Sequence, residues 1–251
     1  NAAASINVFR VLRPDLGLLR RQVTPSSMAK LAKEYRDFPA YSASQAVINA
    51  LSGGLPVLLL TRFFGLPVAG SYAFAVNVLT FPMGFVLSAL RQVLFQKASE
   101  SQHQGRSLLA LYVRVTATLF GMALLPTVVI LAWGPQLFGW FFGAQWHMAG
   151  EFSRALMIWM AVVFCNLPAT LFGRIIRIQR FVFFYDLTLL VARTAALILG
   201  GFFLSAPQTI MAYAVVGAAM NAYLIIAVGR AIMTNEGAAR PDSLLSYLVE
   251  D

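Results

Sequence analysis

Six long hydrophobic segments alternate with short polar or basic segments along the chain. Each is long enough to cross the hydrocarbon core of a membrane as a helix, which takes about 20 residues. The pattern predicts spanning helices at residues 39–64, 67–95, 108–133, 153–173, 181–204 and 208–233. Residues 133–150, with Trp133, Trp140 and Trp146, are predicted to be the longest loop on the outer side, because tryptophans favour the membrane interface.

The residues before the first span form a basic segment with one helix signal. Thr24 and Pro25 match an N-cap followed by proline at the first helical position, and apolar and basic side chains then fall on opposite faces. Such a helix can lie on a membrane surface. We therefore expect a cytoplasmic linker with an interfacial helix at residues 1–38, a six-helix transmembrane lobe at 39–233 and a cytoplasmic tail at 234–251.

Polar side chains recur at helical spacing inside the first two spans. They are Gln45, Asn49 and Ser52 in the first span, and Asn77, Thr80 and Ser88 in the second. Because lipid offers no hydrogen bonds, we expect both stripes to face the interior of the protein. They either join helices through small and polar contacts or line the cavity of a transporter. Gly53, Gly54 and Pro56 also predict a kink or a local break in the first span.

The composition excludes an ordinary soluble domain. The chain is 59% hydrophobic and only 12% charged, whereas charged residues approach about 25% in soluble domains. The net charge of +9 would suggest nucleic acid in a soluble chain, but here the basic residues lie between spans, and no nucleic-acid partner is expected. The sequence therefore predicts an all-α polytopic membrane protein with six transmembrane helices.

No motif for catalysis or metal binding stands out. The chain lacks a phosphate-binding GxxxxGK[ST] loop, a GxSxG nucleophile turn and an HExxH zinc pair. Cys165 is the single cysteine, and His103 and His147 are far apart. We expect no catalytic residues, no metal, no cofactor and no enzymatic activity.

Arginine and lysine placement predicts the orientation in the membrane. If the N-terminal linker is cytoplasmic, sixteen of the 19 basic residues fall on the inner side, and only Arg62 and Arg154 fall on the outer side. Both termini are then cytoplasmic.

Arg193 is the exception, because it lies inside the fifth span. It is about 20 Å along the helix from the preceding basic turn, too deep for its charge to reach the inner face easily. A charged side chain at this depth needs a partner or water. The partner could be Asp186, seven residues earlier on the same face, or Arg193 could line a cavity and bind an anionic substrate. Arg62, at the outer end of its span, is a second candidate.

Several segments resemble one family of transporters. They are residues 34–39 (EYRDFP), 58–65 (LLLTRFFG), 68–73 (VAGSYA), 95–100 (FQKASE) and the outer segment 138–146. Over about residues 30–180 the chain resembles bacterial lipid-linked oligosaccharide flippases, the polysaccharide exporters of the multidrug/oligosaccharidyl-lipid/polysaccharide superfamily. The resemblance implies two six-helix lobes around a central cavity, whose cationic residues meet the diphosphate and sugars of an undecaprenyl-linked oligosaccharide. This chain would be the C-terminal lobe, with an N-terminal lobe missing upstream.

The resemblance implies export of lipid-linked oligosaccharide or polysaccharide precursors by alternating access. Its setting would be the bacterial cytoplasmic (inner) membrane, and its partners the lipid-linked substrate, membrane lipids and the missing lobe. The candidate cavity residues are Arg193, Arg62, Asn49, Gln45, Asn77 and Asp186. Two alternatives stay open: a multidrug or ion-coupled exporter of the same superfamily, and an integral-membrane glycosyl- or acyltransferase.

The orientation can be tested with introduced cysteines. We expect cysteines at Gln102 and Gln179 to be shielded from an impermeant thiol reagent applied outside, because both positions follow the inner basic clusters. A cysteine at Gln145 should be labelled. Labelling at Gln102 from outside would overturn the assignment.

Overall fold

The computed structural model describes residues 37–103, 107–176 and 178–238, which form helices joined by short connections. The helices are α3 (Asp37–Phe64), α4 (Leu66–His103), α5 (Leu108–Phe142), the 3₁₀ turn η1 (Ala144–Trp146), α6 (His147–Cys165), α7 (Leu167–Ile175), α8 (Gln179–Phe203) and α9 (Ala206–Ala238). The predicted interfacial helix after Thr24 lies outside the described residues. So does the tail beyond residue 238, whereas residues 234–238 continue α9.

Six stretches of the described chain are long and apolar enough to cross a membrane. They are Val47–Phe64, Leu66–Arg91, Leu108–Phe142, Ala144–Gly173, Arg180–Phe203 and Ala206–Thr234. This confirms the six predicted spans. The protein is an all-α, multi-pass membrane protein.

The predicted outer loop at 133–150 is wrong for most of its length. α5 continues through Trp133 and Pro135 to Phe142, and only Gly143 and the three residues of η1 separate it from α6. Gly143 has φ +101°, a conformation that favours glycine. Tryptophans favour the membrane interface, and a helix can occupy that depth as well as a loop can.

The fourth span is divided into two helices. α6 ends at Cys165, Asn166 lies between the helices, and α7 begins at Leu167. Pro168, the second residue of α7, has no N–H to donate to the preceding turn, so the helical ladder lacks one bond at this point. The N–H of Asn166 instead donates to the carbonyl of Val163. The sequence pattern predicted one continuous helix at residues 153–173.

The first span, by contrast, is not broken. α3 is a single helix through Gly53, Gly54 and Pro56, where a kink or a break was predicted. Gly65, with φ +86°, is the only residue between α3 and α4. Its N–H donates to the carbonyl of Thr61, so the turn closes the end of α3 directly.

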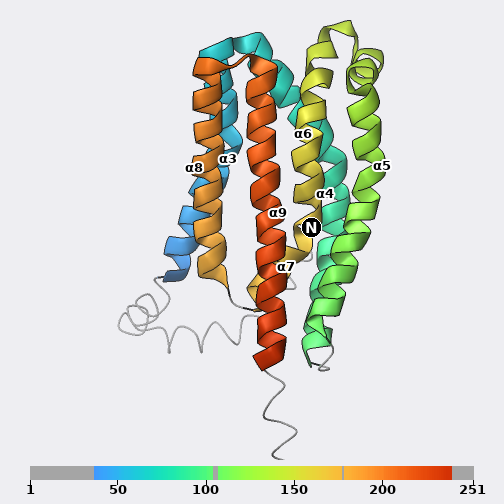
Figure 1. Cartoon of the computed structure of the whole chain (residues 1–251), viewed down its shortest axis with the longest axis vertical. Coiled ribbons are helices and arrows are strands. Elements are labelled where there is room, and N and C mark those ends of the chain that lie inside the picture. The colour runs from blue at the N-terminus through green and yellow to red at the C-terminus, as the bar shows by residue number, and fades with distance from the viewer. Residues whose placement is uncertain (1–36, 104–106, 177, 239–251) are drawn as a thin grey trace, which may run out of the picture. The chain divides into compact units, whose positions relative to one another are not determined.

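The contacts divide the chain into two units, residues 1–47 and residues 48–251. Of the first unit the structure describes only the beginning of α3, and the packing below belongs to the second. There α6 packs against α4, α5 and α9, and α8 packs against α9 (Figure 1). The connections α3–α4, α5–α6 and α8–α9 lie at one end of this unit, and the end of α4 and the start of α8 lie at the other (Figure 1).

Two clusters of buried side chains form the core of this unit. The first lies toward the end that carries the α5–α6 turn and includes Phe138, Phe152 and Tyr213. The second includes Tyr112 on α5 and Phe172 on α7. Helices α4, α5, α6, α8 and α9 contribute to both clusters. Among them α6 packs against α4, α5 and α9, and α9 also packs against α8, so α6 and α9 run through the centre of the packing.

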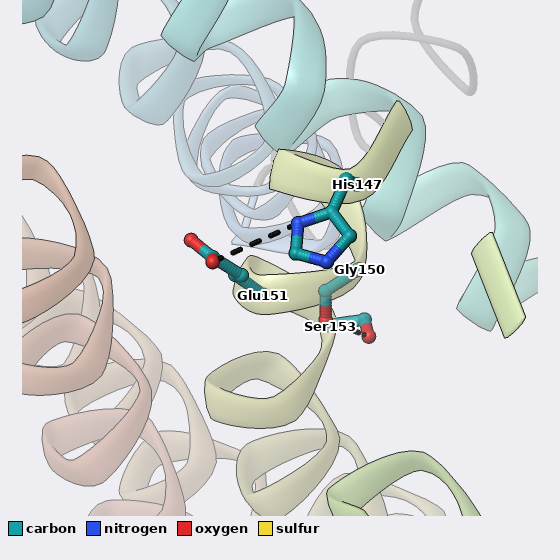
Figure 2. A network of polar contacts seen from close by, with 4 residues as sticks. All are labelled: His147, Gly150, Glu151 and Ser153. Carbon is teal, nitrogen blue, oxygen red and sulfur yellow. Dashed lines mark hydrogen bonds and ion pairs between the residues drawn. The ribbon is translucent and has the colours of Figure 1, made fainter. Parts of the chain in front are cut away.

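The first turn of α6 approaches α5 very closely. A Cβ built on Gly150 would lie 2.4 Å from the Cα of Pro135 and 2.7 Å from the carbonyl oxygen of Gly134. Nearby, the hydroxyl of Ser153 donates to the carbonyl of Gly150 at 2.6 Å, and Figure 2 shows this bond beside the His147–Glu151 ion pair. Backbones can meet this closely in a membrane only where small residues permit it.

Gly150→Ala should destabilise the protein, because its methyl group would overlap backbone atoms of α5 that cannot move separately. Overpacking of this kind costs about 1–3 kcal/mol. Gly139→Ala is the control, since no atom lies within 4 Å of a Cβ at that position on α5. Thermal unfolding of the purified full-length protein in detergent should show a lower Tm for the first variant only. Equal Tm values would contradict the close approach.

Candidate functional site

One face of α4 carries an open groove of about 510 Å³. Its lining residues recur at steps of three and four, so they share one side of the helix. They are Asn77, Thr80, Phe81, Gly84, Phe85 and Ser88. All six lie within the stretch Leu66–Arg91 that can cross a membrane. The groove is therefore a partly polar surface at membrane depth.

The polar groups of the groove have defined roles. The hydroxyl of Thr80 donates to the carbonyl of Val76 at 2.7 Å, and that of Ser88 donates to the carbonyl of Phe85 at 2.9 Å. Both hydroxyl hydrogens are thus used within α4, and the oxygens keep lone pairs that can accept. The exposed amide of Asn77 can both donate and accept.

Two phenyl rings project from the same face. Phe81 and Phe85 are 72% and 67% exposed, and their rings meet edge to face at 5.3 Å. Exposed aromatic rings beside polar groups can bind a ligand that has both apolar and hydrogen-bonding parts.

The predicted stripe of the second span is thus the groove itself. Asn77, like Asn49 on α3, is exposed on the six-helix unit, and neither is in its core. That this surface faces a cavity stays a prediction. Gln45 is in α3, but its side chain lies outside the described side chains. Arg62 is exposed in the last turn of α3.

Arg193 lies elsewhere, inside the helix bundle. Its guanidinium carbon is 3.7 Å from the ring centre of Trp159 on α6 and 3.7 Å from that of Tyr213 on α9. The side chain is 8% exposed. The hydroxyl of Tyr72 on α4 donates to that of Tyr213 at 3.4 Å. Arg193 therefore joins α8 to α6 and α9 through two cation–π contacts, and Tyr72 extends the cluster to α4.

The cluster is closely packed. Nε and Nη2 of Arg193 and Nε1 of Trp159 are buried without hydrogen-bond partners. A Cβ built on Gly217 of α9 would lie 2.8 Å from Cδ1 of Trp159 and 3.2 Å from Nε of Arg193, so only glycine fits there. The charge is met mainly by aromatic faces, and cation–π contacts are worth about 2 kcal/mol or more where water is excluded.

A second polar contact lies next along α9. The amide of Asn166, at the break between α6 and α7, donates to Oδ1 of Asn221 at 2.8 Å. The amide of Asn221 donates in turn to the carbonyl of Gly217 at 2.7 Å. This contact holds the broken fourth span against α9.

The structure does not place Asp186 against Arg193. The groups close enough to Arg193 for electrostatic interaction are Tyr213, Tyr72 and Tyr185, while Asp186 is half-buried and makes an interaction of its own. Arg193 is also separate from the groove, since it does not line it. The six candidate residues thus do not form one site.

Sequence reasoning missed Trp159, Tyr213 and Tyr72. The available signal was on α9, where Tyr213, Gly217 and Asn221 recur every four residues on one face. An aromatic residue, a glycine and an asparagine on one face indicate a helix that packs closely against polar groups. Arg193, which packs at Gly217, comes from another helix, so the spacing of residues on α9 could not predict this contact.

The fold and the groove define a multi-pass membrane protein with a polar, aromatic surface at membrane depth. A family model described as "Polysaccharide biosynthesis protein" matches residues 17–151, more than half of the chain. The chain belongs to this family of polysaccharide biosynthesis proteins. No curated protein and no solved structure matches the chain.

Substitutions of Arg193 should separate packing from substrate binding. We expect Arg193→Lys to lower the stability by about 2 kcal/mol, because a compact ammonium group does not contact both rings as the broad guanidinium does. Arg193→Met should lose less, since it fills the space and removes a buried charge. Thermal unfolding of the full-length protein measures both. Wild-type stability with loss of transport in both variants would instead assign Arg193 to substrate binding.

Proposed function

We propose that this protein moves lipid-linked oligosaccharide or polysaccharide precursors across a membrane, as a transporter and not as an enzyme. Membership of a polysaccharide biosynthesis family supports the class of substrate. Six spans support a role within the membrane. The observation that carries the proposal is the α4 groove, which exposes Asn77, Thr80 and Ser88 at a depth where a helix facing lipid would be apolar.

The physical problem of such transport is the headgroup. A glycan with many hydroxyl groups cannot cross hydrocarbon, because each unpaired polar group there costs several kcal/mol. A polar surface that opens to one side of the membrane at a time removes this barrier. The α4 groove is exposed on the face of α4 that points away from the helix bundle, so a second lobe would complete the passage. Alternating access would then follow from rocking of the two lobes.

The same proposal includes an orientation. The described basic side chains Arg91, Arg114, Arg180 and Arg230 belong to one set of helix ends, while Arg62 and Arg154 belong to the other. The excess of basic residues favours a cytoplasmic location for the first set. We therefore assign the protein to the bacterial cytoplasmic membrane with both termini inside.

Transport can be tested with the full-length protein in liposomes. Undecaprenyl diphosphate carrying a defined oligosaccharide, placed in one leaflet, should move to the other leaflet in a protein-dependent way. Asn77→Leu should slow this movement by about tenfold, because it removes the exposed amide of the groove. Capture of the glycan by an externally added lectin measures the movement.

Thr188→Leu is the matched control for this test. Thr188 is exposed on α8 and its hydroxyl donates to its own helix, at the carbonyl of Phe184, so this change should leave the rate unaltered. Movement of the lipid in protein-free liposomes at the same rate would contradict the proposal. Turnover of the glycan or of its diphosphate by the protein would favour a transferase.

A further inference from the structure

We infer that the α4 groove binds the sugars of the substrate and not its diphosphate or its lipid tail. This inference rests on the proposed function and assigns one part of the substrate to one surface. It follows from three properties of the lining residues: the direction of their hydrogen bonds, their aromatic rings and their lack of charge.

The hydrogen-bonding groups of the groove suit a ligand that donates hydrogen bonds. Thr80 and Ser88 have already given their hydroxyl hydrogens to carbonyls of α4, so they offer the groove only lone pairs. Sugar hydroxyls carry hydrogens to donate and fit such a surface. Diphosphate oxygens only accept, and they would meet lone pairs at both positions. Asn77 is the one lining residue with N–H groups to give.

The aromatic rings suit sugars for a different reason. One side of a hexose ring presents several C–H groups and no hydroxyl, and this apolar side packs on the face of a phenyl ring. Phe81 and Phe85 lie on one side of α4 and are largely exposed, so their rings are free to take this contact. Their mutual edge-to-face packing fixes the ring planes relative to each other.

The absence of charge among the lining residues excludes the diphosphate. Proteins bind diphosphates with arginine, lysine or several backbone N–H groups, because the anion is strongly hydrated in water. None of the six residues that line the groove is charged. The lipid tail does not fit for a different reason: an apolar tail would cover the amide of Asn77 and leave it without hydrogen bonds.

Binding of two lipids to the full-length protein tests this assignment. The probes are undecaprenyl diphosphate bearing a defined oligosaccharide and undecaprenyl diphosphate without sugar. The variant combines Thr80→Val, which keeps the shape and removes the oxygen, with Phe81→Leu, which keeps the apolar character and removes the ring. We expect about tenfold weaker binding of the sugar-bearing lipid and a change within about twofold for the bare lipid.

The control carries the same two changes on α5, as Thr118→Val with Phe120→Leu. Thr118 is exposed and donates to its own helix at the carbonyl of Arg114, and Phe120 is 58% exposed, so the two changes match those on α4 in chemistry and exposure but lie outside the groove. It should bind both lipids as the wild type does. Equal folding of all three proteins is checked by their Tm values.

The outcomes separate the two claims. If the wild type neither binds nor moves the sugar-bearing lipid, the proposed function falls and the inference falls with it. If the wild type moves that lipid but the α4 variant binds it unchanged, only the inference is wrong. An equal loss of affinity for both lipids would place the diphosphate or the tail in the groove and would also overturn it.

Discussion

A membrane interior offers no hydrogen bonds and almost no screening, and the packing of this protein depends on how it holds one cation there. Arg193 contacts the rings of Trp159 and Tyr213, whose centres are each 3.7 Å from its guanidinium carbon. These three side chains come from α8, α6 and α9, two of which run through the centre of the core. The contact therefore fixes the mutual position of the helices on which the others pack, and it needs no carboxylate to do so.

Two groups of polar side chains in the spans solve the same problem differently. Inside the bundle, Arg193 contacts aromatic rings, and Asn166 and Asn221 pair their amides. On the groove face of α4, Thr80 and Ser88 use their hydroxyl hydrogens within their own helix and stay exposed. The first group stabilises the fold, and the second leaves lone pairs and an amide for a ligand. This division supports a rigid unit that carries a binding surface.

Features that depend on one helix could be predicted from the sequence. The six spans follow from runs of apolar residues, and the groove on α4 follows from the spacing of Asn77, Thr80 and Ser88. Features that depend on several helices could not. Asp186 was an attractive partner for Arg193 because both are on one face of α8, yet the rings of Trp159 and Tyr213 come from helices distant in sequence. The length of α5 was missed because tryptophans report membrane depth and not the end of a helix.

The single residue between α3 and α4 has a consequence for how the groove can move. The N–H of Gly65 donates to the carbonyl of Thr61, and its carbonyl accepts from the N–H of Ala69, so the connection is held at both ends. Phe63, two residues before Gly65, packs on Phe202 of α8 with ring centres 5.0 Å apart, which holds the tip of this hairpin in place. The turn and the ring contact therefore fix this end of both helices. A tilt of α4 about that fixed end would displace Ser88, which lies further along the helix, more than Asn77.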